Sequence, residues 1–236
     1  MIALIPARGG SKGIHRKNVQ LISGHPLISY SIAACMLCKQ IEKVIVTSDC
    51  DEIIDVSRKY GANVPFKRPA EFATATSPDS EFLSHFFDNS NADEIVLIRP
   101  TTPLRQPVLM SKIINFYNDN RVNSSGLRTI HEIEETPYKL FYKQDKYCRG
   151  FFESFNDLID YTNLPRQIFP ITYRGNGYLD IVKRSTVENE MTFGDNILGY
   201  VTDSTIDVDS IEHLEMIRTM NSEEKFLLLS FLNSRR

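Results

Sequence analysis

The alternation of short apolar segments with longer amphipathic ones is the feature that most constrains how this chain can fold. Runs rich in β-branched and aliphatic residues occupy 2–6, 43–49 and 94–100, and segments long enough for helices lie between and after them. Short apolar runs bounded by turn residues are typical of buried strands. Strands that alternate with helices form βαβ units, in which helices cover both faces of a parallel sheet. The sequence therefore predicts an α/β fold with a mostly parallel sheet.

Residues typical of helix ends support the predicted helices. Pro26 and Pro78 stand where proline is tolerated, in a first helical turn, and Gly61 stands where a helix stops. Ser77 and Asn221 are the predicted N-caps of the helices that follow them. The predicted helices are 26–39, 51–62, 77–89, 107–120, one that begins at Ser210, and 222–233.

The regular alternation lapses over residues 132–170, a segment rich in aromatic residues, and resumes with apolar runs at 176–182 and 196–202. Aromatic side chains at this density are typical of buried interface anchors. We therefore predict one domain over residues 1–236, with 132–170 as an excursion that serves dimerisation or the substrate site.

Composition narrows the class of protein. The formal net charge is −3 and the isoelectric point is about 6.0, which gives no reason to expect a general nucleic-acid or anionic-membrane partner. No apolar run approaches the roughly 20 residues that span a bilayer, and the start of the chain lacks the order of a signal peptide. Cys35 and Cys38 form a C-x-x-C inside an apolar helix, so we expect core packing and a reduced, cytoplasmic protein.

The loop after the first strand, residues 7–18, concentrates three glycines and four cationic side chains. Glycine lets backbone amides approach a ligand, and such amides form anion-binding concavities. Arginine adds a bidentate fork for phosphate and lysine a point charge. The loop lacks the spacing of the Walker A and Rossmann glycine motifs. Polyphosphate binding is the favoured interpretation, and a solvated surface loop is the alternative.

Asp207 and Asp209 form a second candidate site. On an extended backbone, residues i and i+2 share a face, so both carboxylates are presented together. Two such oxygens beside a triphosphate suit Mg²⁺, which keeps several waters and binds substrate phosphates. The competing interpretation is that Asp209 opens a helix capping box with Glu212.

The loop "IPARGGSKGIHRKN" resembles the opening motif of the acylneuraminate cytidylyltransferase family. The resemblance continues in order through "RPAEFATATSPDS", "RPTTPLR", "LPRQIFPITYRGNGYLDI" and "IDVDSIEHL", and spans residues 1 to about 218. It implies an enzyme that transfers CMP from CTP to the anomeric hydroxyl of a nonulosonic acid, releases pyrophosphate, uses Mg²⁺ and works as a homodimer.

The resemblance also assigns nucleotide residues. Lys12 would stabilise charge on the α-phosphoryl group and the leaving pyrophosphate, Arg8 would hold the triphosphate, and Asp207 and Asp209 would hold the metal. Arg8, Lys12 and Asp209 are thus the predicted catalytic residues. Asp49, which ends the second strand, is either a site residue or a cap of the next helix, and the cap is the favoured interpretation. The predicted nucleotide-binding residues are Arg8, Gly10, Ser11, Lys12, Lys17, Asn18 and Arg68.

On the sugar side, arginine forks would suit the carboxylate of a nonulosonic acid, and Lys139 aligns with a lysine that the family supplies from the partner subunit. The predicted substrate-binding residues are Arg99, Thr101, Lys139, Arg166, Arg174, Asn176 and Asp180.

Three residues depart from the best-known sialic acid synthetases. Arg99 stands where glutamine is usual, Ala75 where aspartate is usual, and Asp180 where tyrosine is common. Arg99 would select a sugar substituent or pair with a carboxylate such as Asp180. The sugar is therefore left open among neuraminic, legionaminic and pseudaminic acids. A 3-deoxy-octulosonate cytidylyltransferase and a nucleotide-binding protein without turnover are the alternatives.

Overall fold

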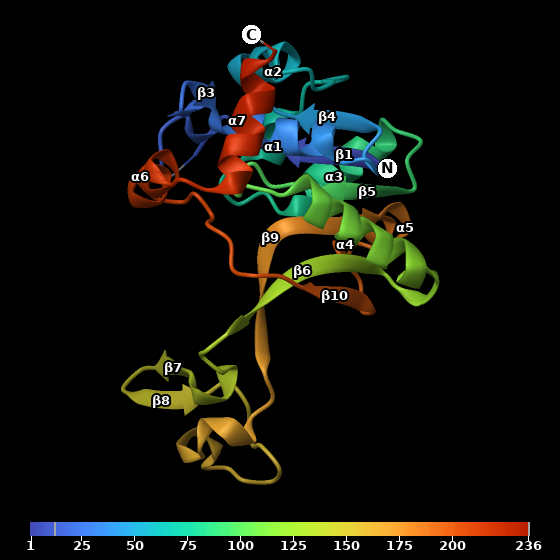
Figure 1. The fold of residues 1–236 in the computed structure, drawn as a ribbon. Helices are drawn as coiled ribbons and strands as arrows, with labels where there is room; N and C mark the ends of the chain where they lie inside the picture. Colours follow the sequence, from blue (N-terminus) through green and yellow to red (C-terminus); the bar gives the residue numbers. More distant parts are fainter. Residues whose placement is uncertain (12, 236) are drawn as a thin grey trace. The chain divides into compact units, whose positions relative to one another are not determined.

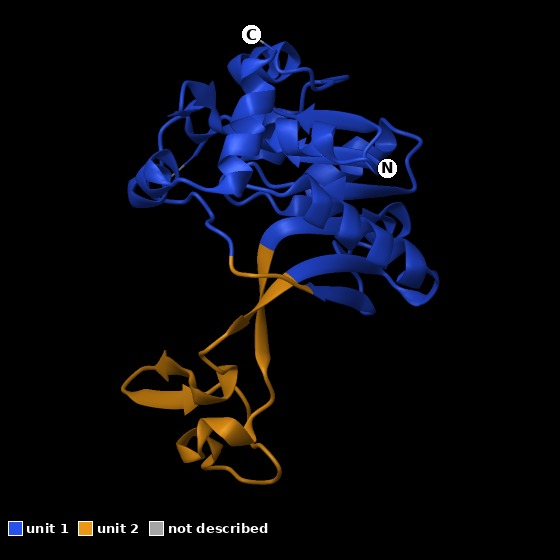
Figure 2. Ribbon diagram, in the orientation of Figure 1, with its two compact units in different colours: residues 1–129, 177–200, 205–236 blue, residues 130–176, 201–204 orange. Residues whose placement is uncertain are grey.

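The computed structural model describes residues 1–11 and 13–235. The chain divides into two compact units (Figure 2). Unit 1 comprises residues 1–129, 177–200 and 205–236, and unit 2 comprises residues 130–176 and 201–204. The excursion predicted over 132–170 falls within unit 2.

A six-stranded sheet with the strand order β10-β6-β9-β5-β1-β4 organises the fold (Figure 1). β1 pairs in parallel with both β4 and β5, while β9 runs antiparallel to β5. In this register Leu4 faces Leu97, and Leu97 faces Asp180. The strands are β1 (Ile2–Pro6), β4 (Lys43–Thr47), β5 (Glu94–Leu97), β6 (Gly126–Ile133), β9 (Thr172–Lys183) and β10 (Ile197–Val201).

Alternate residues of a strand point to opposite faces of the sheet. In this sheet both sets are apolar, and helices cover both faces. Ala3 and Ile5 pack into one core, together with α1, α2, α4, α6 and α7, whereas Leu4 packs into the other, with α3 and α5. The predicted α/β fold is confirmed. The helices are α1 (Leu27–Leu37), α2 (Asp51–Lys59), α3 (Asp79–Asp88), α4 (Pro107–Asn120), α5 (Arg184–Glu188), α6 (Ile211–Thr219) and α7 (Glu223–Asn233).

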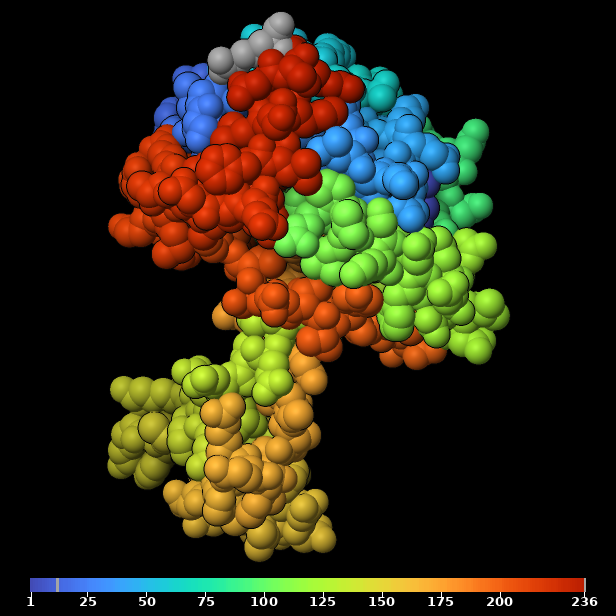
Figure 3. All heavy atoms as spheres, viewed as in Figure 1, coloured from blue at the N-terminus to red at the C-terminus, as the bar shows by residue number. Residues whose placement is uncertain are grey.

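The end of the chain packs against its beginning within unit 1. Figure 3 shows the red C-terminal segment lying against the blue N-terminal region, and α7 contacts α1. The buried His25 ring lies 3.0 Å from the Tyr60 hydroxyl and 3.0 Å from Asn233 Oδ1, so it ties α2 and α7 to the short ribbon that precedes α1. The short elements of unit 1 are η1 (Lys17–Val19), β2 (Leu21–Ile22), β3 (His25–Pro26), η2 (Ala70–Ala73) and η3 (Arg121–Asn123).

The starts of four helices differ by one residue from those predicted. Pro26 and Ser210 are the N-caps of α1 and α6 rather than their first residues. Pro78 rather than Ser77 is the N-cap of α3, because the Ser77 hydroxyl is engaged with Thr74 and with the Glu71 carbonyl. Ser222 rather than Asn221 caps α7, accepting a hydrogen bond from the Lys225 amide.

Unit 2 contains regular structure that the sequence analysis did not predict. β7 (Phe141–Gln144) and β8 (Tyr147–Gly150) form an antiparallel hairpin. Tyr138 stacks on both Phe152 and Phe169, with ring centroids 4.6 and 5.0 Å apart. The hydroxyl of the buried Tyr161 donates to the Phe152 carbonyl. The remaining elements of unit 2 are η4 (Pro137–Lys139), η5 (Tyr161–Asn163) and η6 (Arg166–Ile168).

The cysteines and the hydropathy of the helices bear on two further predictions. Cys35 and Cys38 are buried free thiols in the core, as predicted, while Cys50 and Cys148 are also unpaired. In the part of the chain that the structure describes, no helix combines the length and the apolar character needed to cross a membrane.

Candidate active site

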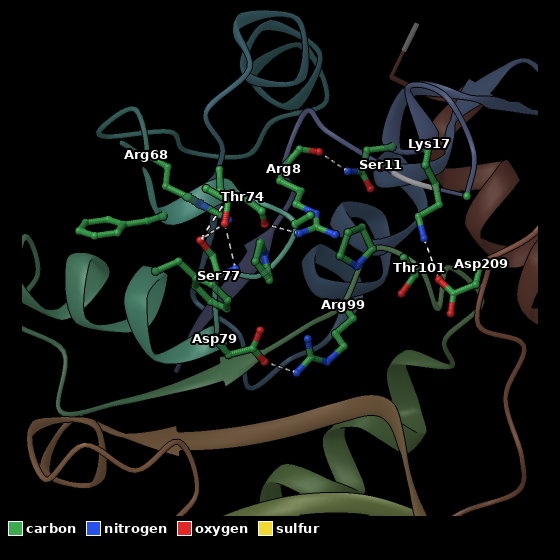
Figure 4. Close-up of a pocket in the computed structure, with 18 residues that line it drawn as sticks. Arg8, Ser11, Lys17, Arg68, Thr74, Ser77, Asp79, Arg99, Thr101 and Asp209 are labelled. Atoms are coloured by element: carbon green, nitrogen blue, oxygen red, sulfur yellow. Dashed lines mark hydrogen bonds and ion pairs between the residues drawn. The ribbon is translucent and has the colours of Figure 1, made fainter. Parts of the chain in front are cut away.

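A cavity of about 450 Å³ in unit 1 gathers residues from four separate stretches of the chain (Figure 4). Its walls include the end of β1 and the segments that follow β1 and β5, which is where open α/β sheets bind ligands. The described lining residues are Pro6, Arg8, Ser11, Gly13, Lys17, Asn18, Arg68, Phe72, Ala73, Thr74, Ala75, Ser77, Asp79, Phe82, Arg99, Pro100, Thr101 and Asp209.

The glycine-rich loop after β1 is held by contacts from elsewhere in the fold. The Gly9 amide donates to Asp49 Oδ1 at 2.9 Å, and Cys50 is the N-cap of α2. The interpretation of Asp49 as that helix's cap is therefore wrong, because its carboxylate anchors the loop. A Cβ at Gly13 would lie 2.4 Å from the Asp209 carbonyl oxygen, so no other residue fits there without a shift of the backbone. Gly10 is exposed and does not line the cavity.

Arg8 and Asn18 connect this loop to its surroundings. Arg8 Nη1 donates to the Thr74 carbonyl at 2.5 Å, which joins the loop to the segment that follows η2. Asn18 is 4% exposed, and its Nδ2 donates to the Arg8 carbonyl at 3.1 Å. Among the described residues, Asn18 Oδ1 accepts no hydrogen bond. A buried carbonyl without a donor indicates a group that awaits a ligand or a water.

Arg68 forms a buried cationic wall of the cavity. Its Nη2 donates to the Thr47 carbonyl at 2.7 Å, and its guanidinium carbon lies 4.9 Å from the centre of the Phe82 ring. Burial lowers the pKa of Arg68 to about 10, against the opposing charges of Asp49 and Asp79. The side chain is still a cation at neutral pH, and its position is fixed by β4 and α3.

Arg99 follows β5 and meets Asp79, the first residue of α3. Arg99 Nη2 lies 2.5 Å from Asp79 Oδ2, and both side chains are about one-third exposed (Figure 4). Burial acts to lower the pKa of Arg99, but the charge and hydrogen bond of Asp79 outweigh it, so the pKa is raised above its usual value. The expected pairing with a carboxylate is observed, with Asp79 rather than Asp180 as the partner.

Arg105, which the sequence analysis did not single out, holds the wall that carries Arg99. It is fully buried and donates to the carbonyls of Arg99 at 2.8 Å, Gly177 at 3.1 Å and Tyr178 at 2.5 Å, as well as to the Thr102 carbonyl. One guanidinium thus joins the segment after β5 to β9. The signal in the sequence was the "PLR" that ends the "RPTTPLR" segment.

Lys17 and Asp209 form an ion pair at the opposite side of the cavity, with Lys17 Nζ 2.8 Å from Asp209 Oδ1. The hydrogen bond from Lys17 is the main cause that lowers the pKa of Asp209, and the neighbouring Asp207 side chain contributes. Ser210, not Asp209, is the N-cap of α6, accepting from the His213 amide at 3.3 Å. The capping interpretation of Asp209 is therefore wrong, and its carboxylate is available to a ligand.

The acidic pair fits a cation that keeps its waters. Asp207 and Asp209 are both exposed, and Asp209 lines the cavity whereas Asp207 does not. In the described residues, no group of three or more His, Cys, Asp or Glu side chains is arranged to enclose a metal. Two accessible carboxylates suit Mg²⁺, which is usually bound by one or two carboxylates, waters and substrate phosphates.

Asp180 lies on β9 and is buried, with 1% of its surface exposed, and it does not line the cavity. Neither carboxylate oxygen accepts a hydrogen bond from a described side chain, and Arg128 Nε lies 3.8 Å from Oδ1. Burial raises the pKa of Asp180 above its ordinary value of 3.8, although Arg128 and Arg99 oppose the shift. A buried carboxylate with so few partners destabilises the folded state when it is ionised.

Asp180→Asn should therefore change how stability depends on pH. Since the folded-state pKa is raised, the favourable contribution of Asp180 is present below the unfolded-state pKa and is lost as pH rises through the folded-state value. The wild type should gain stability relative to Asp180→Asn as pH falls from 7 toward 4, which urea denaturation at several pH values would measure. The exposed Asp119→Asn is the control. A difference that shrinks on acidification would contradict this account.

Four predicted substrate residues belong to unit 2. Lys139, Arg166 and Arg174 are exposed there, and Asn176 Nδ2 donates to Thr202 Oγ1 at 2.7 Å. Their roles toward a sugar stay predictions.

The cavity brings together most of the predicted nucleotide residues. Lys12 lies outside the described residues. Asp79 and Phe72 also line the cavity but were not among the predicted site residues. The sequence features that could have indicated them are the acidic start of a helix and the aromatic residue in "RPAEF". The predicted site residues that line the cavity are Arg8, Ser11, Lys17, Asn18, Arg68, Arg99, Thr101 and Asp209.

Solved nucleotidyltransferases share the fold of this chain. CMP:2-keto-3-deoxy-manno-octonic acid synthetase, solved in complex with CTP, superimposes with a TM-score of 0.69 at 15% identity and covers 92% of this chain and 96% of that one. A 4-diphosphocytidyl-2C-methyl-D-erythritol synthase from Anaerococcus prevotii gives a TM-score of 0.61 at 13% identity, covering 92% and 93%.

The model of the cytidylyltransferase family matches residues 2–226, and the chain belongs to this family. It is 29% identical to N-acylneuraminate cytidylyltransferase from Escherichia coli over 95% of its length, although it spans only 52% of that protein. It is 29% identical to CMP-N,N'-diacetyllegionaminic acid synthase from Legionella pneumophila, covering 89% of this chain and 91% of that protein. Pseudaminic acid cytidylyltransferase from Campylobacter jejuni is 25% identical, with coverage of 95% and 99%. The resemblance found in the sequence is confirmed.

Proposed function

We propose that this protein transfers CMP from CTP to the anomeric hydroxyl of a nonulosonic acid and releases pyrophosphate. The observation that carries the proposal is the cavity in unit 1, where Arg8, Arg68 and Arg99 converge and the ion pair of Lys17 with Asp209 lies on the opposite side. A site with this density of cations suits two anionic substrates, a triphosphate and an acidic sugar. Membership of the cytidylyltransferase family supports the reaction class, and the named relatives support the class of sugar.

The chemistry needs little covalent participation from the protein. The anomeric oxygen forms a bond to the α-phosphorus of CTP, the bond from that phosphorus to the bridging oxygen breaks, and the hydroxyl proton leaves. Positioning of both substrates and stabilisation of negative charge then supply most of the rate. Arg8 and Lys17 would hold the phosphates, and Arg105 would keep Arg99 in place through the carbonyl that it grips.

Mg²⁺ is the cofactor we propose, with Asp207 and Asp209 as its protein ligands. When bound, the ion would neutralise charge on the triphosphate. The hydrogen bond from Lys17 lowers the pKa of Asp209, which favours the ionised carboxylate that a cation would bind.

The reaction is tested by pyrophosphate release with CTP and a panel of acids: N-acetylneuraminic, legionaminic, pseudaminic and 3-deoxy-octulosonic acid. Turnover with a nonulosonic acid and little with the octulosonic acid is the expected result. CTP binding without pyrophosphate release from any acid would instead leave a nucleotide-binding protein.

We expect the base to be selected by Asn18 and the wall around Arg68. No donor among residues 1–11 and 13–235 reaches the buried Asn18 Oδ1, which suits an amino or hydroxyl group of the nucleoside. CTP should outcompete ATP and GTP by well over tenfold, that is, by more than about 1.4 kcal/mol. Competition assays at fixed sugar would measure the ratio, and Asn18→Ala should reduce it. Equal turnover with ATP would remove the cytidylyl assignment while leaving phosphate binding intact.

We also propose that the protein is a homodimer formed through unit 2, and that it works in the cytoplasm, where its four free cysteines would stay reduced. Unit 2 exposes many large apolar side chains, which is unusual for a surface that faces water. They include Phe141, Tyr147, Phe151, Ile159 and Ile171, each more than half exposed.

If Lys139 acts on the partner's site, Lys139→Ala should lower turnover, and mixing it with Asp209→Asn should partly restore activity through hybrid dimers. The control is a mixture of Asp209→Asn with Lys17→Ala, both of which lie in the unit 1 cavity. Light scattering would report the oligomeric state. A protein that is monomeric at micromolar concentration would defeat the proposal.

A further inference from the structure

Asp79 is an acidic side chain in a cavity proposed to bind two anions. It lines the same wall as Arg99 and is bonded to it at 2.5 Å. Figure 4 shows the two side chains meeting across the space between α3 and the end of β5. A carboxylate here would repel the proposed anionic substrates, so attraction of those substrates does not explain why Asp79 lies in the cavity.

Arg99 is held in place independently of Asp79. Its backbone carbonyl accepts from Arg105 Nη2 at 2.8 Å. Its stem rests against Gly177, where a Cβ would approach Arg99 Cδ to 3.2 Å and where φ is +65°, a conformation that favours glycine. The register pairs Leu97 with Asp180, so Asp180 lies diagonally beside Arg99 on the same face of the sheet and attracts its guanidinium.

Asp79 is in turn stabilised independently of Arg99. It is the first residue of α3, a ten-residue helix, and the partial positive charge of a helix N-terminus favours a carboxylate. Its side chain is also 32% exposed, so water can solvate the oxygen that Arg99 leaves. Each partner can therefore release the other without leaving a buried charge unpaired.

We propose that Asp79 occupies the position on Arg99 that an oxyanion of the substrate takes. When substrate binds, its carboxylate or phosphate oxygen replaces the Asp79 carboxylate on the guanidinium. This inference rests on the proposed function. An oxyanion fits because a guanidinium donates hydrogen bonds to carboxylate and phosphate oxygens alike, as Arg99 Nη2 does to Asp79 Oδ2. Two sources share this chemistry, the carboxylate of the sugar and a phosphate of CTP.

The exchange makes Asp79 a specificity-determining residue. A ligand that brings an oxyanion to Arg99 replaces the ion pair with Asp79 by an equivalent one. A neutral analogue would have to break the ion pair without replacing it. Asp79 therefore weakens the binding of every ligand, and it weakens the binding of neutral ones most.

Asp79→Asn tests the inference because it keeps the shape of the side chain and removes the competing charge. The Michaelis constant of the substrate that supplies the oxyanion should fall by about fivefold, the scale of a partly exposed ion pair. A lower constant for the sugar points to its carboxylate, and a lower constant for CTP points to a phosphate. The matched control is Glu71→Gln, which makes the same charge change on an exposed residue of η2 that does not line the cavity.

The same substitution in an Arg99→Gln background separates exchange from general charge effects. There, Asp79→Asn should change neither constant beyond what Glu71→Gln does, since no guanidinium remains to be released. A rise in the constants for Asp79→Asn would show that Asp79 positions Arg99, and an equal effect with Glu71→Gln would show simple repulsion. Either result overturns the inference. Failure of the proposed function is distinct, because the wild type would then turn over no acid in the panel.

Discussion

Replacing Lys12 with alanine should lower kcat by about a hundredfold or more, the range seen when a charge-stabilising donor is lost from a transition state. The sequence places Lys12 within the glycine-rich loop, where a long side chain can follow the charge that develops on the α-phosphoryl group. An interaction made only in the transition state lowers kcat, whereas uniform binding changes KM. Steady-state kinetics with CTP would separate the two.

Arg8 and Arg16 supply the comparison. Arg8 lines the cavity and should act in the ground state, so Arg8→Ala should mainly raise the KM for CTP. Arg16 is outside the cavity and paired with Glu52, and Arg16→Ala should do little. A Lys12→Ala protein with near-normal kcat would mean that the loop is only a binding cradle.

Loss of the acidic pair should have an effect of similar size. Asp209→Asn should lower kcat by about a hundredfold or more at saturating CTP, because charge stabilisation on the triphosphate would be lost. The concentration of Mg²⁺ at half-maximal rate should also rise, and removal of divalent cations from the wild type should abolish pyrophosphate release. Titration of Mn²⁺ into the protein with a non-hydrolysable CTP analogue would report binding without turnover.

Glu212→Gln is the matched control for this experiment. Glu212 is an exposed acid in the first turn of α6, three residues from Asp209, and its replacement changes the net charge equally. The control should retain nearly full activity. If Asp209→Asn were equally active at limiting Mg²⁺, the carboxylate would not be a metal ligand.

The sheet was predictable where burial on both faces dictates the residue types. From Ile2 to Ile5 in β1 and from Val44 to Thr47 in β4, the residues are β-branched or aliphatic because helices cover the sheet on both faces. The interpretation of both segments as strands is correct. β6 was missed because Arg128 and Glu132 interrupt its apolar residues, so neither helical nor strand periodicity is visible. The hairpin of β7 and β8 was missed because every residue of β7 is exposed and its turn uses Asp145 at φ +52° rather than glycine.

Most residues of the candidate site were predictable from the sequence, but the contacts between them were not. The resemblance supplied Arg8, Asn18 and Arg68, and the structure brings them together. The helix-cap interpretations of Asp49 and Asp209 were wrong because the Gly9 amide and the Lys17 ammonium, both distant in sequence, engage these carboxylates. Short-range rules for helix caps contain no information about such contacts.

The wall that Asp209 forms beside the glycine-rich loop has a consequence for when the cavity forms during folding. The ion pair of Lys17 with Asp209 joins residues 192 apart, and the Val208 amide also donates to the Thr101 carbonyl at 2.7 Å. Contacts of such long sequence separation form late, because the intervening chain must first be ordered. During synthesis, β1 and its loop emerge first, yet the wall that confines the loop is made nearly last. A ribosome-bound chain that ends before residue 205 would thus lack the acidic side of the unit 1 cavity.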